Sequence, residues 1–347
     1  MTAREKAEAT AVSAEPAREK RGVSWRGIAQ LVIGLGALAL VVMKSDARGL
    51  AEAIRNTRVA LLPLAVVASF LVTLLMAYRW GVILKVRGYR FDVRHLFAYY
   101  LMGNFFTNFV PGGSLSGDVV RLIFISREAR DKAFILSTLV YERLIGMFTL
   151  LLVGLIATLA SRNYVQTDPA LYLTEAILGM AFIAIAMMMS EWVSSRMARL
   201  IETLSARFKI ERTGRAAART ILAISELRRS KGLLARTVAV SVVVRVVWGL
   251  GCYTVSRAMG LPLSLPIIFA FISLADLVRL MPISIGGLGV REWALVALFA
   301  SVGVSQEKAV TFSLLAFAPI YLNAIAGGII YISRARVVRK EVAAVEG

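Results

Sequence analysis

The sequence predicts an all-α integral membrane protein with six full transmembrane helices and two re-entrant helical hairpins that are related as an inverted repeat. Three observations predict this fold class. Hydrophobic residues make up 58% of the chain and the mean hydropathy is +0.71, whereas soluble domains are roughly 45–50% apolar. Apolar runs close to the length of about 20 residues that a spanning helix needs recur along the chain. Two similar glycine-rich segments lie in opposite halves.

Six apolar runs predict the full spans, at residues 27–43, 59–78, 143–160, 171–189, 236–255 and 311–332. Residues 1–26 are largely charged and alanine-rich, which predicts a disordered cytoplasmic tail. No small-residue cleavage site follows the first run, so we expect it to be an anchor rather than a removed signal peptide. The transmembrane domain is therefore expected to cover residues 27–335, with residues 336–347 as a cytoplasmic tail.

The net charge of +19 is best explained by topology, because the basic residues lie in loops and no soluble basic domain is present to bind nucleic acid. The positive-inside rule places both termini and the basic loops 79–94, 127–132 and 190–235 in the cytoplasm. The connections 161–170 and 257–266 hold one arginine each and belong outside. Loop 44–58 must also lie outside, although it holds four basic residues. We expect a multi-pass protein of the bacterial inner (plasma) membrane.

The long loop 190–235 has apolar residues at helical spacing, namely Val193, Met197, Leu200, Ile201, Leu204 and Phe208. This spacing predicts an amphipathic helix. Its basic side chains would meet the anionic lipids of the inner leaflet. Packing on the protein's own cytoplasmic face explains the pattern equally well.

The segment 95–120 is largely apolar and lies between two cytoplasmic loops, so it must enter and leave the membrane by the same face. Proline and glycine break helices and therefore mark the turn of such a hairpin. In the second half, "PISIGGLGVR" aligns with "PGGSLSGDVVR" at Ser114, Gly117, Val120 and Arg121. The predicted turn residues are Pro111, Gly112, Gly113 and Gly117 in the first hairpin and Pro282, Gly286, Gly287 and Gly289 in the second.

The second hairpin is expected to begin and end outside, opposite to the first. Two similar segments of opposite orientation, each between two spans, indicate an inverted repeat. Chance matching of small residues is the alternative explanation.

Ionisable groups inside apolar segments are costly and usually mark functional sites. The candidates for substrate binding are Asp118, Arg121, Glu142, Arg143, Asp276, Arg279, Arg291 and Glu292, with Arg245 as a further intramembrane charge. Guanidinium groups match phosphate, and helix N-termini in a broken hairpin add positive potential. Purely structural roles, as helix caps or as neutralising ion pairs, are the alternative for each charge.

Catalytic and metal-binding patterns are missing from the sequence. One cysteine, Cys252, and one histidine, His95, cannot form a disulfide or a zinc cluster. Ser114 and Ser116 have no plausible base, and the glycine-rich segments have no P-loop lysine. We therefore expect no metal, no cofactor and no enzymatic activity.

The segments "FTNFVPGGSLSGDVVRLIFISRE", "ERLIG" and "LMPISIGGLGVREWALVALFASVGV" resemble the lysylphosphatidylglycerol synthase transmembrane-region family, over about residues 27–335. The resemblance implies a flippase-like membrane domain. In that family the membrane domain moves aminoacylated phospholipid between leaflets. Family members that consist of the membrane domain alone are linked to the export or handling of other lipids and lipid-linked sugars. Because the sequence ends at Gly347 without the soluble aminoacyl-transfer domain of the bifunctional members, synthase activity is not implied.

We therefore expect a lipid flippase or transporter that moves a phospholipid or glycolipid with a polar or anionic head group between leaflets. A membrane-embedded transferase acting on a lipid-linked donor is one alternative. A non-catalytic membrane scaffold for lipid-modifying enzymes is the other.

Overall fold

The computed structural model describes residues 45–110, 114–126, 128–129, 131–162, 169–188, 230–280 and 284–346, together with scattered positions in 32–43 and 190–227. The predicted N-terminal tail, most of the run 27–43 and most of the loop 190–235 lie outside the described residues. So do four predicted turn residues, Pro111, Gly112, Gly113 and Pro282.

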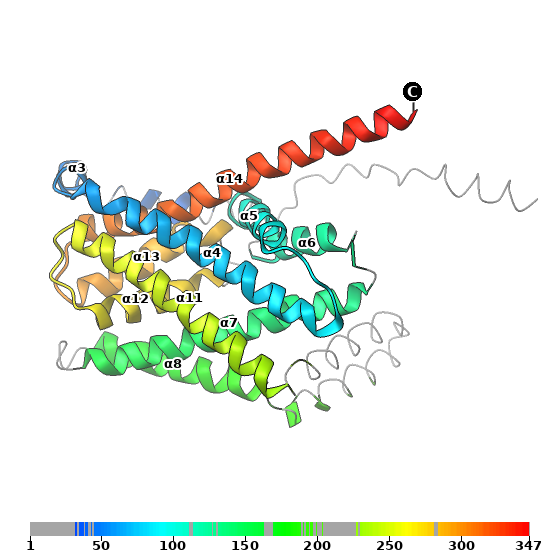
Figure 1. Ribbon diagram of the computed structural model, residues 1–347. Coiled ribbons are helices and arrows are strands. Elements are labelled where there is room, and N and C mark those ends of the chain that lie inside the picture. The colour runs from blue at the N-terminus through cyan, green and yellow to red at the C-terminus, as the bar shows by residue number, and fades with distance from the viewer. Residues whose placement is uncertain are drawn as a thin grey trace, which may run out of the picture.

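Every regular element among the described residues is a helix. In chain order these are α3 (Ala47–Arg55), η1 (Val59–Leu61), α4 (Leu62–Leu84), η2 (Lys85–Arg87), α5 (Val93–Phe109), α6 (Ser114–Ile125), α7 (Lys132–Ser161), α8 (Pro169–Met188), α11 (Lys231–Ala258), α12 (Leu265–Leu280), η3 (Ile285–Gly287), α13 (Val290–Ala300) and α14 (Gln306–Glu346). The long helices form a single elongated bundle (Figure 1). The predicted C-terminal tail continues α14 as far as Glu346.

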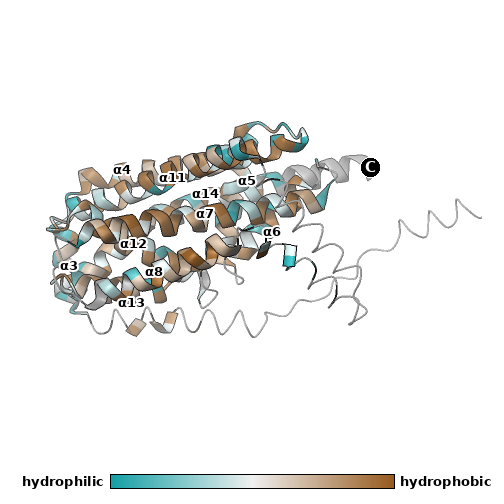
Figure 2. Cartoon of the chain, turned by 90° about the horizontal axis from the view of Figure 1, so that it is seen from below, coloured by the Kyte–Doolittle hydropathy of each residue, from teal (hydrophilic) through white to brown (hydrophobic). Residues whose placement is uncertain are grey.

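Among the described residues, four segments are long and apolar enough to cross a membrane: Val59–Arg87, Lys132–Ser161, Lys231–Ala258 and Gln306–Arg334. They contain four of the predicted runs. The apolar part of α8, Glu175–Met187, is shorter. Large apolar side chains such as Val67, Met180 and Ile329 are exposed on these helices, and apolar residues predominate along the bundle (Figure 2). Such extended apolar surface suits contact with lipid rather than water, as expected of a multi-pass membrane protein.

The first hairpin, α5 with α6, begins and ends at one end of the bundle. It starts directly after α4 and η2, and α7 starts directly after it. Arg87, at the end of η2, forms an ion pair of 2.7 Å with Asp131, the N-cap residue of α7. The end of α4 and the start of α7 therefore lie together, and the chain between them enters the bundle and returns.

The second hairpin, α12 with α13, begins and ends at the opposite end. The carbonyl of Ala258, which ends α11, accepts a hydrogen bond of 2.8 Å from the amide of Arg58, just before α4. Gln306, which begins α14, donates a hydrogen bond of 3.1 Å to Ser45 Oγ, just before α3. The 23 residues of α4 separate the two ends by about 34 Å at 1.5 Å per residue. The two hairpins therefore enter the bundle from opposite ends (Figure 1).

The helix contacts are the same when the two halves are exchanged. Helix α4 packs against α11, while α5 packs along α14 and α12 packs along α7. Replacing α4 by α11, α5 by α12 and α7 by α14 gives the same set of contacts. This is the pattern that a pseudo-twofold axis between the two halves produces.

Several glycines allow backbones to approach closely. A Cβ atom on Gly327 of α14 would lie 1.8 Å from the carbonyl oxygen of Leu101 in α5. Gly117 was predicted in the first turn, but it lies inside α6, where a Cβ atom would lie 2.5 Å from the carbonyl oxygen of Gly103. The prediction was wrong because glycine is used in close helix–helix contacts as well as in turns.

In the second hairpin the glycines do form the turn. Gly286, Gly287 and Gly289 have φ angles of 62°, 80° and 81°, which L-residues with a side chain rarely adopt. Gly286 lies against Asn108 at the end of α5, where its Cβ atom would be 3.1 Å from Asn108 Oδ1. The tips of the two hairpins therefore touch inside the bundle.

Candidate functional site

A cavity of about 240 Å³ lies between the two halves of the bundle, with walls from α4, α5, α6, α7, α11, α12 and α14. Six of the eight predicted substrate-binding residues line it: Asp118, Arg121, Glu142, Arg143, Asp276 and Arg279. Arg79 and Arg245 line it as well. The rest of the wall is mixed, with apolar side chains such as Met76, Met147 and Trp248.

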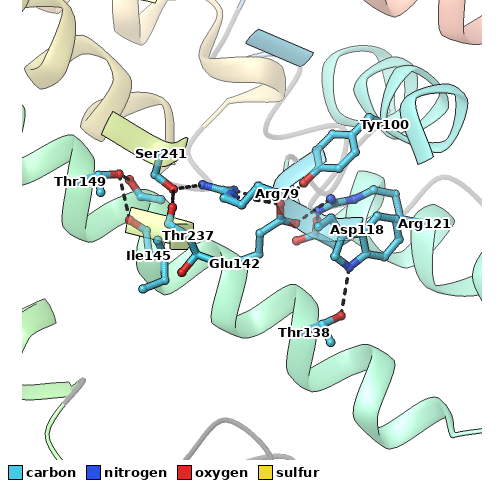
Figure 3. A network of polar contacts seen from close by, with 12 residues as sticks. Arg79, Tyr100, Asp118, Arg121, Thr138, Glu142, Ile145, Thr149, Thr237 and Ser241 are labelled. Carbon is cyan, nitrogen blue, oxygen red and sulfur yellow. Dashed lines mark hydrogen bonds and ion pairs between the residues drawn. The ribbon is translucent and has the colours of Figure 1, made fainter. Parts of the chain in front are cut away.

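Glu142 of α7 is the centre of a buried polar network (Figure 3). Its side chain is 2% exposed. Its Oε1 atom accepts hydrogen bonds from Arg79 Nη2 at 3.0 Å, from Arg79 Nε at 3.3 Å and from the hydroxyl of Tyr100. Its Oε2 atom accepts one of 3.0 Å from Arg121 Nη1. One carboxylate thus ties α4 and both arms of the first hairpin to α7.

The network continues in two directions. Arg79 Nη1 donates a hydrogen bond of 2.6 Å to Ser241 Oγ of α11, which joins the second half. Asp118 pairs with both Arg121 and Arg143. The side chains of Asp118 and Arg143 are 18% and 30% exposed, so this part of the network opens to the cavity while Glu142 and Arg79 are shielded. The guanidinium of Arg121 also lies over the ring of Tyr100, at 4.2 Å from the centroid.

The second half contributes a smaller charged group. Arg245 of α11 pairs with Asp276 of α12 at 3.2 Å, and its Nη2 atom donates a hydrogen bond of 3.3 Å to the carbonyl of Gly146 in α7. Arg279 lies one turn beyond Asp276 and forms no hydrogen bond or ion pair with the described residues. Its aliphatic stem covers Gly287, where a Cβ atom would be 2.4 Å from Arg279 Cγ.

Arg291 and Glu292 were also predicted to bind substrate, but they do not line the cavity. Both are almost fully buried at the start of α13, where they form an ion pair with each other. Glu292 accepts hydrogen bonds from the amide of Gly289 at 2.6 Å and from Ser313 Oγ at 3.2 Å. Arg291 lies 3.8 Å from the ring centroid of Phe317. Their contacts hold the second hairpin against α14, and Asp276 and Arg279 take their place at the cavity.

The predicted location of Arg79 was also wrong: the residue was assigned to the cytoplasmic loop 79–94. The structure continues α4 to Leu84, and the side chain of Arg79 is only 4% exposed. The apolar residues that follow it, Trp80, Ile83 and Leu84, are the sequence signal for this extension. Tyr100 was also missed, since a tyrosine in an apolar segment has no distinguishing pattern.

The comparisons with known proteins agree with this architecture. A model of the lysylphosphatidylglycerol synthase TM region matches residues 27–327. A UPF0104 membrane protein of Methanothermobacter thermautotrophicus is 23% identical over 298 residues, which is 81% of this chain and 87% of that protein. The UPF0104 membrane protein MJ1595 of Methanocaldococcus jannaschii is 31% identical over 105 residues, 28% of this chain and 31% of that protein. This chain therefore belongs to the lysylphosphatidylglycerol synthase transmembrane-region family.

Proposed function

We propose that this protein is a flippase that moves a lipid with a polar or anionic head group between the leaflets of the bacterial inner membrane. The observation that carries the proposal is the cavity of about 240 Å³ inside an apolar bundle, lined by both charged and apolar side chains. A charged lining is costly in a membrane unless it faces a polar ligand or water. A lipid head group can occupy such a cavity while its acyl chains stay in the bilayer.

The arrangement of the hairpins supports a transport cycle. They enter from opposite ends, their tips meet at Asn108 and Gly286, and the helix contacts are unchanged when the halves are exchanged. These features support two hairpins related as an inverted repeat. We further propose six full spans, and on the positive-inside rule both termini in the cytoplasm. In transporters of this kind, one half rocks against the other around a fixed site near the middle of the membrane.

We propose transport without a chemical step. The sequence has no ATP-binding motif, so the driving force would be an ion gradient, the membrane potential or the concentration gradient of the lipid itself.

The proposal is tested with the purified protein in liposomes that contain an anionic phospholipid labelled on one acyl chain. Quenching from outside measures how fast the labelled lipid changes leaflet. We expect the protein to accelerate this exchange at least about tenfold over protein-free liposomes, as a barrier lowered by only 1.4 kcal/mol already gives that factor.

A pair of tryptophan variants, one inside the cavity and one outside it, tests whether the lipid passes through the cavity. Met147→Trp fills part of the cavity wall and should abolish the acceleration. Met180→Trp places the same side chain on the exposed face of α8 and should leave it unchanged. Exchange no faster than in protein-free liposomes, or equal exchange by the two variants, would overturn the proposal.

A further inference from the structure

The charges that line the cavity do not balance. Among the described residues the lining holds five arginines, Arg79, Arg121, Arg143, Arg245 and Arg279, and three carboxylates, Asp118, Glu142 and Asp276. The lining therefore has two positive charges in excess. An uncompensated charge within a membrane protein is unfavourable, so the excess is expected to be neutralised by a ligand.

The excess is divided between the two halves of the site. In the first half, Glu142 and Asp118 are shared among three arginines, of which Arg143 has the most exposed side chain. In the second half, Asp276 pairs with Arg245, and no carboxylate of the described residues pairs with Arg279. Each half thus adds one net positive charge to the lining. Arg143 on α7, which also pairs with Asp118, and Arg279 on α12 both line the cavity and can present this charge to a ligand.

These two arginines lie close enough to act on one group. Gly154 of α7 lies against Ser273 of α12, where its Cβ atom would be 2.7 Å from that of Ser273. The two helices run in opposite directions, so this register places Arg279 within five residues of Arg143 along the axis, about 8 Å. Arg245 confirms the proximity, because it contacts Gly146, one turn from Arg143, and Asp276, one turn from Arg279. Two long arginine side chains can bridge such a separation.

Two guanidinium groups that reach the same ligand can bind the oxygens of one phosphate through paired, charge-assisted hydrogen bonds. A phosphomonoester carries a charge of about −1.5 to −2 at neutral pH, which matches the excess. The phosphodiester of an ordinary phospholipid carries a single negative charge. An aminoacylated phosphodiester has no net negative charge, because its ammonium groups offset the phosphate.

We infer that the cavity selects lipids whose head group ends in a doubly charged phosphate, a phosphomonoester or a diphosphate, over phosphodiester and aminoacylated lipids. This inference rests on the proposed function. The same chemistry would also fit a free phosphate or diphosphate ion.

The test compares three lipids with identical labelled acyl chains in the same liposomes: phosphatidic acid, phosphatidylglycerol and lysylphosphatidylglycerol. We expect leaflet exchange of phosphatidic acid to be accelerated at least about tenfold more than that of phosphatidylglycerol, which is the effect of one additional charge-assisted hydrogen bond. Lysylphosphatidylglycerol should exchange most slowly.

Variants of the excess arginines should change the preference and not only the rate. Arg279→Gln removes one positive charge, so the ratio of the phosphatidic acid rate to the phosphatidylglycerol rate should fall about tenfold, while Arg279→Lys keeps the charge and should retain most of the preference. Arg257→Gln, on an exposed residue at the end of α11, is the control and should match the wild type. A variant that is only misfolded would slow both lipids equally and leave their ratio unchanged.

The possible failures are distinguishable. Equal acceleration of all three lipids, or a preference for the lysyl lipid, would overturn the inference and leave the proposed flippase standing. Acceleration of none of them would overturn the proposed function itself. Binding of inorganic diphosphate to the purified protein, without any lipid exchange, would assign the site to a soluble anion and overturn both.

Discussion

The substitution Glu142→Gln tests whether the buried network holds the bundle together. It replaces the carboxylate with a neutral amide of the same shape. Arg121 keeps its pair with Asp118. Arg79, which is 4% exposed, loses its only carboxylate among the described residues and keeps Ser241.

The structure sets the size of the effect. Removing one partner of a buried ion pair leaves an uncompensated buried charge, which costs about 3–5 kcal/mol. We therefore expect Glu142→Gln to lower the free energy of unfolding by that amount. The double variant Arg79→Met, Glu142→Gln removes both charges and should regain at least about 1 kcal/mol of it, because residues in direct contact couple by about 0.5–3 kcal/mol.

The assay is equilibrium unfolding of the protein in mixed detergent micelles, followed by circular dichroism. Glu175→Gln is the matched control, because its partner Arg162 is 54% exposed and remains solvated when the pair is lost. Although the Glu175 side chain is 11% exposed, the charge left behind stays in solvent, so we expect a loss close to that of a surface pair, about 0–1 kcal/mol. A loss for Glu142→Gln that is no larger than the loss for Glu175→Gln would refute the assignment of a stabilising role to the network.

Two further predictions follow from the fold. Gly327→Ala should lower the free energy of unfolding by about 3 kcal/mol or more, because the new Cβ atom would overlap the carbonyl of Leu101. In the control Gly179→Ala, in α8, the new Cβ atom meets nothing within 4 Å, so this variant should raise the free energy of unfolding by about 0.5–1 kcal/mol. Equal effects of the two variants in the same unfolding assay would contradict the close contact of α5 with α14. In a variant without Cys252, single cysteines at Arg90 and Lys308, both exposed, should react with a membrane-impermeant maleimide from opposite sides of the membrane; labelling of both from one side would contradict the opposite entry of the two hairpins.

Much of the helical architecture follows from the sequence alone, because apolar length and the breaking of helices by glycine and proline are local properties. The start and end of the first hairpin, for example, were predicted from the charge of its flanking loops, and the pairing of Arg87 with Asp131 agrees. The helix ends are harder. Arg79 was assigned to a loop because charge counts cannot distinguish a solvated arginine from one that is buried against a carboxylate 63 residues away.

Which charged residues line the cavity depends on ion pairs between helices, and these cannot be deduced from the sequence. Asp276 and Glu292 were equally good candidates, since both are carboxylates in apolar segments near the second turn. They differ in what lies beside them. Glu292 has Arg291 as its neighbour and the amide of Gly289 within hydrogen-bond distance, so its charge is satisfied locally. Among the described residues Asp276 pairs only with Arg245 of another helix, and both residues line the cavity.

The same difference explains why the two repeats cannot have the same role at the site. Arg121 and Arg291 occupy equivalent places in the aligned motifs, yet only Arg121 lines the cavity. In the first hairpin the nearest acid, Asp118, lies one turn away on the same helix face and is shared with Arg143 of α7. The second motif has Leu288 at the position of Asp118 and a glutamate directly after the arginine. Arg291 is therefore neutralised within its own helix, and the positive charge of the second half moves to Arg279 on the entering arm. The two halves share the same helix contacts, yet their charges differ: on one wall two carboxylates are shared among three arginines, and on the other Arg279 has no ion pair with the described residues.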